Sequence, residues 1–205
     1  MSKRYIVLAI LLMGLAFGLT QLPEKPARPA ITPENLLIEI NDPSRFLSTD
    51  LIAKRMIERD PGLFLVDVRT PEQYEEYALP GSVNIPLDEL LNAAWVDYLD
   101  QDAMDIVFYS NADVYADQAW AFSIQQGYNN LYIMRGGVNE WFRTIMQPEA
   151  PLDTDPTVDF EKYSFRKGAS QYFGGTPNEV SSDAPVKKKQ VVVRKKKKKE
   201  AEGGC

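Results

Sequence analysis

The sequence predicts an α/β fold in which an open, parallel, five-stranded sheet is flanked by helices. Two apolar runs, residues 63–68 and 105–109, lack the polar alternation of a half-exposed strand, which is typical of strands buried on both faces of a parallel sheet. Residues with helical spacing follow these runs, and turns rich in Gly or Pro separate them. An order in which strands and helices alternate favours this class of fold.

A chain of 205 residues has room for one ordinary domain and extensions at both ends. We place the domain at residues 45–147 and expect a linker with a short helix at 23–44 before it. After it we expect an extension with a short helix at 148–175 and a disordered Lys-rich tail at 176–205, which ends in Gly-Gly-Cys.

The N-terminal residues 1–22 contain a near-continuous apolar run after Lys3 and Arg4. Residues 5–19 match the length of a signal-peptide apolar region, and counting on to residue 22 gives a marginal membrane span. We expect an uncleaved anchor that enters the membrane through residues 5–22, with the domain facing the periplasm or the exterior. The alternative is a signal peptide that is cleaved, which would leave a secreted protein.

Three helix starts are indicated by a Thr or Ser before a helical segment. Thr32 precedes Pro33, Thr70 precedes Pro71, and Ser48 or Thr49 begins the segment between them. In the helix after Thr32 we expect an inward apolar stripe of Leu36, Leu37 and Ile40. In the helix after Ser48 or Thr49 we expect Leu51, Ile52, Met56 and Ile57 to face inward. Further elements are expected as short strands at 46–47 and 82–85 and a helix at 88–99.

The segment 105–141 predicts a buried strand, a six-residue loop and a helix. The loop comprises Ser110, Asn111, Ala112, Asp113, Val114 and Tyr115. Small or apolar residues at 116, 119, 120, 123 and 124 have helical spacing, and Gly127 suits the helix end. A strand at 130–134 and a Gly136-Gly137 turn into a helix with Trp141 follow. A loop between a strand and a helix directs backbone N–H groups toward one centre, which suits an anion or a nucleophile.

Four stretches of this sequence resemble a rhodanese domain. They are Leu-Val-Asp-Val-Arg-Thr-Pro-Glu-Gln-Tyr at 65–74, Leu-Pro-Gly-Ser-Val-Asn-Ile-Pro at 79–86, Tyr-Ser-Asn-Ala-Asp-Val-Tyr-Ala at 109–116 and Gly-Tyr-Asn-Asn-Leu-Tyr-Ile-Met-Arg-Gly-Gly-Val-Asn-Glu-Trp at 127–141. The resemblance covers roughly residues 46–146. It implies a rhodanese-like fold and sulfur transfer through a persulfide on a loop cysteine. It also implies that Asp67 and Arg69 support the loop, while a purely structural ion pair remains the alternative.

The loop departs from the family pattern Cys-x-x-Gly-x-Arg at every defined position. Ser110 stands at the cysteine, Asp113 at the glycine and Tyr115 at the arginine. A serine hydroxyl cannot hold a persulfide, and the chain has no histidine that could activate it as a nucleophile. We therefore expect a domain without sulfurtransferase activity that binds or regulates an unknown protein partner in the cell envelope. A changed chemistry at Ser110 is the other interpretation.

Charge and cysteine content suggest what the two ends of the chain do. The net charge is −6, but nine Lys or Arg residues and only two Glu lie from Lys187 onward, so the rest of the chain is strongly acidic. The stretch Lys187–Lys199 could hold an anionic surface, and the acidic remainder argues against specific nucleic-acid binding. The single cysteine, Cys205, is the alternative persulfide site of a sulfur carrier. We expect no cofactor and no metal, because histidine is absent and the acidic residues 97, 100, 102 and 105 lack calcium-loop spacing.

Overall fold

The computed structural model describes residues 3–20 and 29–175 of the chain. The predicted tail at 176–205, with Lys187–Lys199 and Cys205, lies outside the described residues, as do residues 23–28 of the predicted linker.

The sheet has five parallel strands in the order β1-β5-β4-β2-β3, so the predicted open parallel sheet is confirmed. Its central strand is β4 (Asp105–Tyr109), which pairs with β2 (Leu63–Asp67) on one side and β5 (Leu131–Met134) on the other. The two edges are the short strands β1 (Phe46–Leu47) and β3 (Val83–Asn84). Because all strands run the same way, their C-terminal ends meet at one edge of the sheet.

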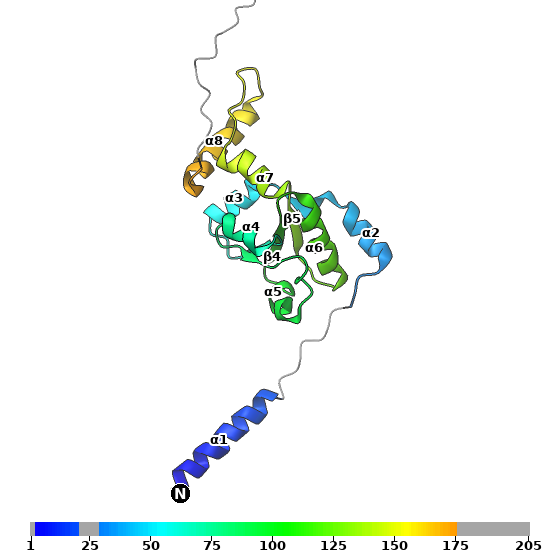
Figure 1. Ribbon diagram of the computed structural model, residues 1–205, viewed down its shortest axis with the longest axis vertical. Coiled ribbons are helices and arrows are strands. Elements are labelled where there is room, and N and C mark those ends of the chain that lie inside the picture. The colour runs from blue at the N-terminus through cyan, green and yellow to red at the C-terminus, as the bar shows by residue number, and fades with distance from the viewer. Residues whose placement is uncertain (1–2, 21–28, 176–205) are drawn as a thin grey trace, which may run out of the picture.

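Helices cover both faces of the sheet (Figure 1). One face packs on α6 (Asp113–Gln125), with the single turn α5 (Val96–Leu99) beside it, and Trp120 is its largest buried side chain. The other face packs on α3 (Thr49–Ile57), α7 (Gly137–Trp141) and α8 (Thr157–Phe173), and Trp141 is its largest buried side chain. Successive side chains of β4 alternate between the two cores, as the pleat requires: Ile106 and Phe108 on one side, Val107 and Tyr109 on the other.

All three predicted helix starts are observed. Thr32, Ser48 and Thr70 are N-caps whose hydroxyl oxygens accept hydrogen bonds from the backbone at Asn35, Leu51 and Gln73. These caps precede α2 (Pro33–Asn41), α3 and α4 (Pro71–Glu76). The short 3-10 turn η1 (Pro43–Arg45) joins α2 to β1.

Some expected inward faces and one expected helix were wrong. Leu37, Ile40 and Leu51 are exposed. In α2 and α3, Leu36 and Ile52 are the side chains that turn toward the domain. The helix predicted over 88–99 is divided into turns, the 3-10 helix η2 (Ala93–Trp95) and α5. The Asn92 side chain accepts a hydrogen bond from the backbone N–H of Ala94, as an N-cap residue does, so a new helical turn begins at Ala93.

The C-terminal extension packs on the domain through α8. A π-helical turn, η3 (Phe142–Met146), leads out of α7, and residues 147–156 connect it to α8. Arg166 of α8 donates from Nε and Nη2 to the two carboxylate oxygens of Asp50 on α3, both at 2.7 Å. Gly174 ends the helix at φ 78°, the left-handed conformation that glycine adopts without strain.

The apolar N-terminal segment forms α1 (Lys3–Thr20). This helix has 18 residues including Lys3 and Arg4, whereas a membrane span needs about 20 mostly apolar residues. Among the residues described, no helix combines the length and the apolar character that crossing a membrane requires. The predicted membrane anchor over residues 5–22 is therefore not supported.

Candidate functional site

Ser110 lies directly after the central strand β4, at the edge of the sheet where the C-terminal ends of the strands meet. Three segments converge on it. The end of β2 brings Asp67 and Arg69, the turn after β5 brings Gly136 and Gly137, and the first turn of α6 follows the loop itself. This is the edge where open α/β sheets place ligands.

The loop is shorter than the sequence indicated. We expected an irregular segment over 110–115, but α6 begins at Asp113, and only residues 110–112 separate it from β4. Asp113 is favourable beside the positive end of the helix dipole, and its side chain also accepts a hydrogen bond from the backbone N–H of Gly136, which holds the start of the helix at this position. Val114 and Tyr115 consequently lie on the first helical turn, with 64% and 57% of their surface exposed.

The Ser110 side chain is enclosed and already hydrogen-bonded. Only 1% of the residue is exposed, and its Oγ donates to the backbone carbonyl of Ala112. The carbonyl of Ser110 accepts from the backbone N–H of Val138 at 2.8 Å, and that of Asn111 accepts from Asn139 at 3.1 Å. The loop is thus fixed to the start of α7 by backbone bonds.

Gly137 makes this close approach possible. A Cβ at this position would lie 2.2 Å from the carbonyl oxygen of Ser110, and the residue has a φ of 58°. No side chain fits between the loop and α7 at that distance, and the backbone angle also favours glycine. The glycine pair predicted to open the helix therefore also shapes the loop.

Asp67 and Arg69 support the loop from the neighbouring strand. Both are buried, with 0% and 5% exposed, and Arg69 binds the carboxylate through Nε at 3.0 Å and Nη2 at 2.6 Å. Nη1 of the same guanidinium donates to Oδ1 of Asn111 at 3.1 Å. Burial lowers the pKa of Arg69, but its hydrogen bonds to Asp67 and the carboxylate charge raise it, and the net shift is upward. Through these bonds the pair links the end of β2 to the loop after β4.

A hydroxyl network below the loop was not foreseen from the sequence. Tyr109 donates to Oγ of Ser82 at 2.8 Å and accepts from the backbone N–H of Leu79 at 3.2 Å, and Tyr74 donates to the carbonyl of Ser82 at 2.6 Å. Burial raises the pKa of Tyr109, and the charge of Asp67 adds to that shift. In the sequence, a tyrosine at the end of an apolar strand is interpreted as a core residue. Only the structure, which brings Tyr109 next to Ser82, shows that its hydroxyl links two loops.

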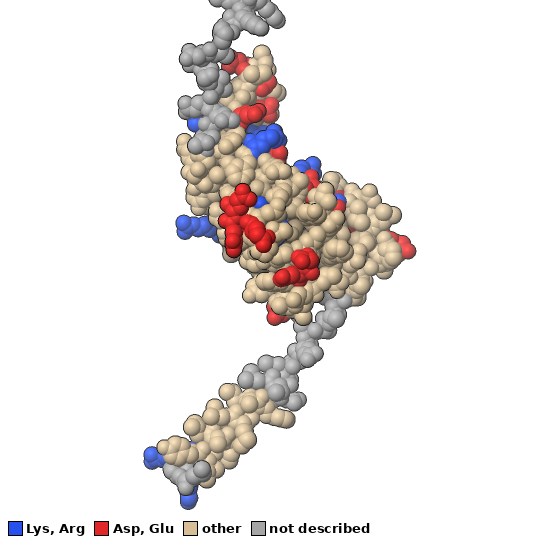
Figure 2. Space-filling model, viewed as in Figure 1, with Lys and Arg blue, Asp and Glu red and all other residues tan. Residues whose placement is uncertain are grey.

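Acidic residues lie at the start of α6 and on α4, the helix that follows Arg69 in sequence. Oδ1 of Asp113 accepts from the backbone N–H of Gly136 at 2.5 Å, which ties the first turn of α6 to the turn after β5. The helix α4 carries exposed Glu72, Glu75 and Glu76, and acidic side chains gather over it on the face drawn in Figure 2. Within the described residues, no group of three or more acidic or cysteine side chains is placed to hold a metal ion.

Comparisons with known proteins identify the domain. The family model described as rhodanese-like domain matches residues 49–144. A thiosulfate:glutathione sulfurtransferase of Saccharomyces cerevisiae is 28% identical over 99 residues, covering 43% of this chain and 71% of its own. A sulfurtransferase of Allochromatium vinosum is 28% identical over 105 residues, covering 51% of this chain and 94% of its own. A tRNA uridine(34) hydroxylase of Hamiltonella defensa is 31% identical over 98 residues, covering 46% of this chain, but the match spans only 27% of the hydroxylase.

Solved structures with a similar fold include the rhodanese-like domain of the Anabaena Alr3790 protein. It is 19% identical, with a TM-score of 0.43, and covers 55% of this chain and 88% of its own. The BH2092 protein of Bacillus halodurans is 21% identical, with a TM-score of 0.45, and covers 54% of this chain and 80% of its own. On the strength of the family match and the parallel five-stranded sheet, residues 49–144 of this chain form a rhodanese-like domain.

Proposed function

We propose that this rhodanese-like domain binds or regulates a protein partner and does not transfer sulfur at its loop. The observation that carries the proposal is the group at the end of β4, which is the hydroxyl of Ser110 and not a thiol. A persulfide needs a sulfur atom to which the transferred sulfur can bond, and a hydroxyl cannot supply one. The hydroxyl is also buried and already donates to Ala112, so it is poorly placed to attack a substrate.

The charges around the loop support the same conclusion. Thiosulfate is an anion, and Asp113 and the exposed glutamates of α4 would repel it. The Arg69 guanidinium donates to Asp67, Asn111 and the carbonyl of Tyr77, so most of its N–H groups are already used within the protein. The chain has no histidine, so the usual activating base for a serine nucleophile is missing.

The exposed side chains of the first turn of α6 support a binding role. Val114 and Tyr115 present apolar surface at the rim of the loop, and Phe122 extends it along the same helix with 41% exposed. Exposed aromatic and aliphatic side chains on a rigid helix are typical of protein-binding surfaces. In this proposal the protein partner binds the exposed side chains of α6 beside the loop that carries the reactive cysteine in rhodaneses.

We propose further that the chain is exported, with α1 acting as a signal segment. The large apolar side chains of this helix from Tyr5 to Phe17 are exposed, most of them by more than half of their surface, so they need an apolar environment that the domain does not supply. Lys3 and Arg4 precede them in the order that secretory signals have. An intact-mass measurement on the native protein tests this, because cleavage removes the mass of the segment.

The competing function is a sulfur carrier that uses Cys205. Two relatives named as sulfurtransferases favour it, because they place sulfur chemistry on similar domains. Cys205 is the one thiol of the chain, so any persulfide on this protein must form there.

A thiosulfate-to-cyanide transfer assay on the full chain separates these functions. The binding-module proposal expects turnover at the background rate for the wild type, for Ser110→Ala and for Cys205→Ser. Turnover that disappears in Cys205→Ser would establish the carrier and reject the proposal. Turnover that persists in Cys205→Ser and disappears in Ser110→Ala would assign the activity to the loop and reject it equally.

A further inference from the structure

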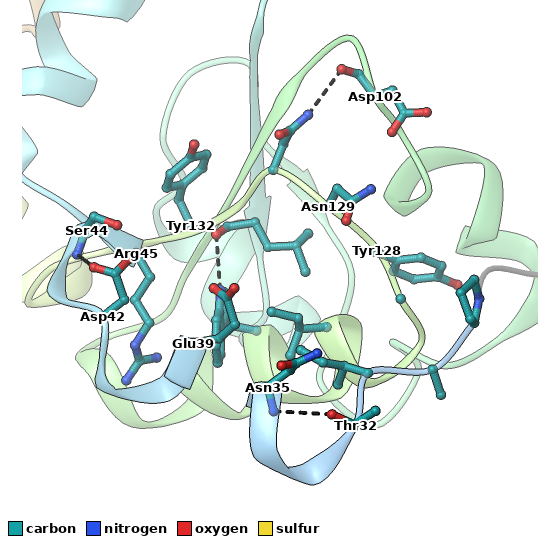
Figure 3. A pocket seen from close by; sticks show the side chains of 18 residues that line it. Thr32, Asn35, Glu39, Asp42, Ser44, Arg45, Asp102, Tyr128, Asn129 and Tyr132 are labelled. Atoms are coloured by element: carbon teal, nitrogen blue, oxygen red, sulfur yellow. Dashed lines mark hydrogen bonds between the residues drawn. The ribbon is translucent and has the colours of Figure 1, made fainter. Parts of the chain in front are cut away.

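A cavity lies at the opposite edge of the sheet from Ser110, where the strands begin (Figure 3). Its volume is about 870 Å³, within the range of small-molecule sites. Helix α2 supplies Asn35 and Glu39 along one side, and the segment before and at the start of β5 supplies Tyr128, Asn129 and Tyr132 along the other. The cavity shares no residue with the loop after β4, so it is a separate candidate site.

The charges that line this cavity favour a cation. Glu39, Asp42 and Asp102 contribute three carboxylates. The backbone N–H of Ser44 donates to Asp42 at 2.8 Å, and this hydrogen bond lowers the pKa of Asp42, so the group stays ionised at neutral pH. Glu39 comes from the last turn of α2, where the negative end of the helix dipole further attracts positive charge.

The arginine that lines the cavity does not balance these carboxylates. Arg45 forms an ion pair with Asp117, so its charge is already matched. Its guanidinium carbon lies 4.4 Å from the ring centre of Phe46 and 4.6 Å from that of Trp120, which places the group between two aromatic rings. Within the part of the chain that the structure describes, its Nε is buried without a hydrogen-bond partner, but the charge of the guanidinium is matched by Asp117. An anionic ligand would therefore meet three carboxylates and one arginine that is already ion-paired.

Apolar and aromatic surface accompanies the carboxylates. Ile31, Ile124 and Leu131 line the cavity together with the half-buried ring of Tyr128. Apolar surface does not stabilise a bare metal ion, which binds oxygen ligands, and the described residues hold no metal-binding cluster. An alkyl chain can lie along it, and an ammonium group at the end of that chain can contact both a carboxylate and an aromatic face.

We propose that this cavity binds a primary ammonium group on an alkyl stem, with the cation beside Glu39 and Asp42 and the stem against Ile124 and Tyr128. The same chemistry occurs in a free alkyl diamine and in a lysine side chain of another protein. Two probes represent these sources: cadaverine for the free amine, and N-acetyl-lysine methylamide for the protein side chain.

The test is a titration of the full-length, ¹⁵N-labelled protein followed by NMR. We expect saturable shifts of the side-chain amides of Asn35 and Asn129 and of the backbone amide of Tyr128. The dissociation constant should be about a millimolar, as one exposed ion pair and the burial of the alkyl stem support. The probe that binds more tightly identifies the source. Pentanol has the stem without the charge, and ammonium chloride has the charge without the stem, so neither should reproduce the shifts.

Two variants of α2 test the role of the carboxylate. Glu39→Gln should weaken binding by about fivefold, the upper range for a solvent-exposed ion pair. Glu34→Gln makes the same change on the same helix outside the cavity and should leave the affinity unchanged. Tyr128→Leu removes the aromatic face and should also weaken binding, while unshifted amides elsewhere confirm that each variant is folded. Equal weakening by both glutamine variants, shifts centred away from the cavity, or no saturable shift with either probe would overturn the proposal.

Discussion

Arg69 ties the end of β2 to the loop after β4, because its Nη1 donates to Oδ1 of Asn111 at 3.1 Å. The same guanidinium binds both carboxylate oxygens of Asp67 through Nε at 3.0 and 3.1 Å. Two loops that lie 42 positions apart in sequence therefore share one buried cation. The position of the Ser110 loop depends on this cation as well as on its own backbone.

Replacing Arg69 by Met should destabilise the protein strongly. The variant leaves the Asp67 carboxylate buried without a cation, and breaking a buried pair from one side costs about 3–5 kcal/mol. The double variant Asp67→Asn with Arg69→Met removes both charges and should lose less. The free energy of unfolding in urea measures both, and a loss below about 1 kcal/mol for Arg69→Met would contradict a supporting role for the pair.

Replacing Gly137 by Ala should distort the loop. The added Cβ would lie 2.2 Å from the carbonyl oxygen of Ser110 and 2.7 Å from the carbonyl carbon of Asn111. Both are backbone atoms, so the loop or α7 must move, and the φ of 58° adds strain of about 1–2 kcal/mol for a residue with a side chain. We expect a loss of several kcal/mol, seen as a lower midpoint in thermal unfolding.

Gly168 provides the matched control for this change. It lies inside α8 with no atom within 4 Å of an added Cβ, so the alanine meets open space. Alanine is the better helix former by about 1 kcal/mol, and Gly168→Ala should stabilise the protein slightly. Equal effects of the two substitutions would show that the close approach at Gly137 does not constrain the fold.

The parts of the fold that sequence reasoning recovered are those set by local chemistry. The buried strands at 63–67 and 105–109 each contain four consecutive apolar residues. Thr32, Ser48 and Thr70 begin helices because a hydroxyl can bind a free backbone N–H there. Gly127 was also predicted from local chemistry, because glycine adopts the left-handed conformation at a helix end without strain, and its φ is 79°.

The parts that it missed depend on distant contacts. Leu37 looked like part of an inward stripe, but the direction in which α2 docks leaves it exposed. The loop boundary at Asp113 is fixed by a backbone N–H of Gly136, 23 residues away. The cavity between α2 and the start of β5 joins segments about 90 residues apart, so no local pattern could reveal it. The roles assigned to Ser110, Asp67, Arg69 and Cys205 stay predictions.

The ion pair between Arg166 and Asp50 should contribute measurably to the docking of α8. Both of its bonds are 2.7 Å long, and the two side chains are 27% and 28% exposed, so water screens the pair only in part. A double-mutant cycle with Arg166→Ala and Asp50→Ala should give a coupling of about 1–2 kcal/mol. The pair of Arg143 with Glu140, where the arginine is 66% exposed, is the control and should give about 0.3–0.5 kcal/mol.

Buried Tyr109 should make the protein sensitive to alkaline pH. Burial is the main cause that raises the pKa of Tyr109 above its ordinary value, the charge of Asp67 adds to it, and the hydrogen bonds with Ser82 and Leu79 oppose it in part. In the unfolded chain the phenol ionises near pH 10, while in the folded protein it keeps its proton to higher pH. The native state then binds more protons above about pH 10, so the free energy of unfolding falls as the pH rises through that range.

The variant Tyr109→Phe separates this titration from the hydrogen bonds. At neutral pH it should cost about 1–3 kcal/mol, because the backbone N–H of Leu79 and the hydroxyl of Ser82 lose a partner. Between neutral pH and pH 11 the free energy of unfolding of Tyr109→Phe should fall less than that of the wild type. In the variant, the unfolded state is no longer stabilised by ionisation of this phenol. Tyr115→Phe, at an exposed position, should follow the wild-type curve. Urea unfolding across the alkaline range measures all three proteins, and parallel pH profiles for wild type and Tyr109→Phe would show that the alkaline loss arises from another group.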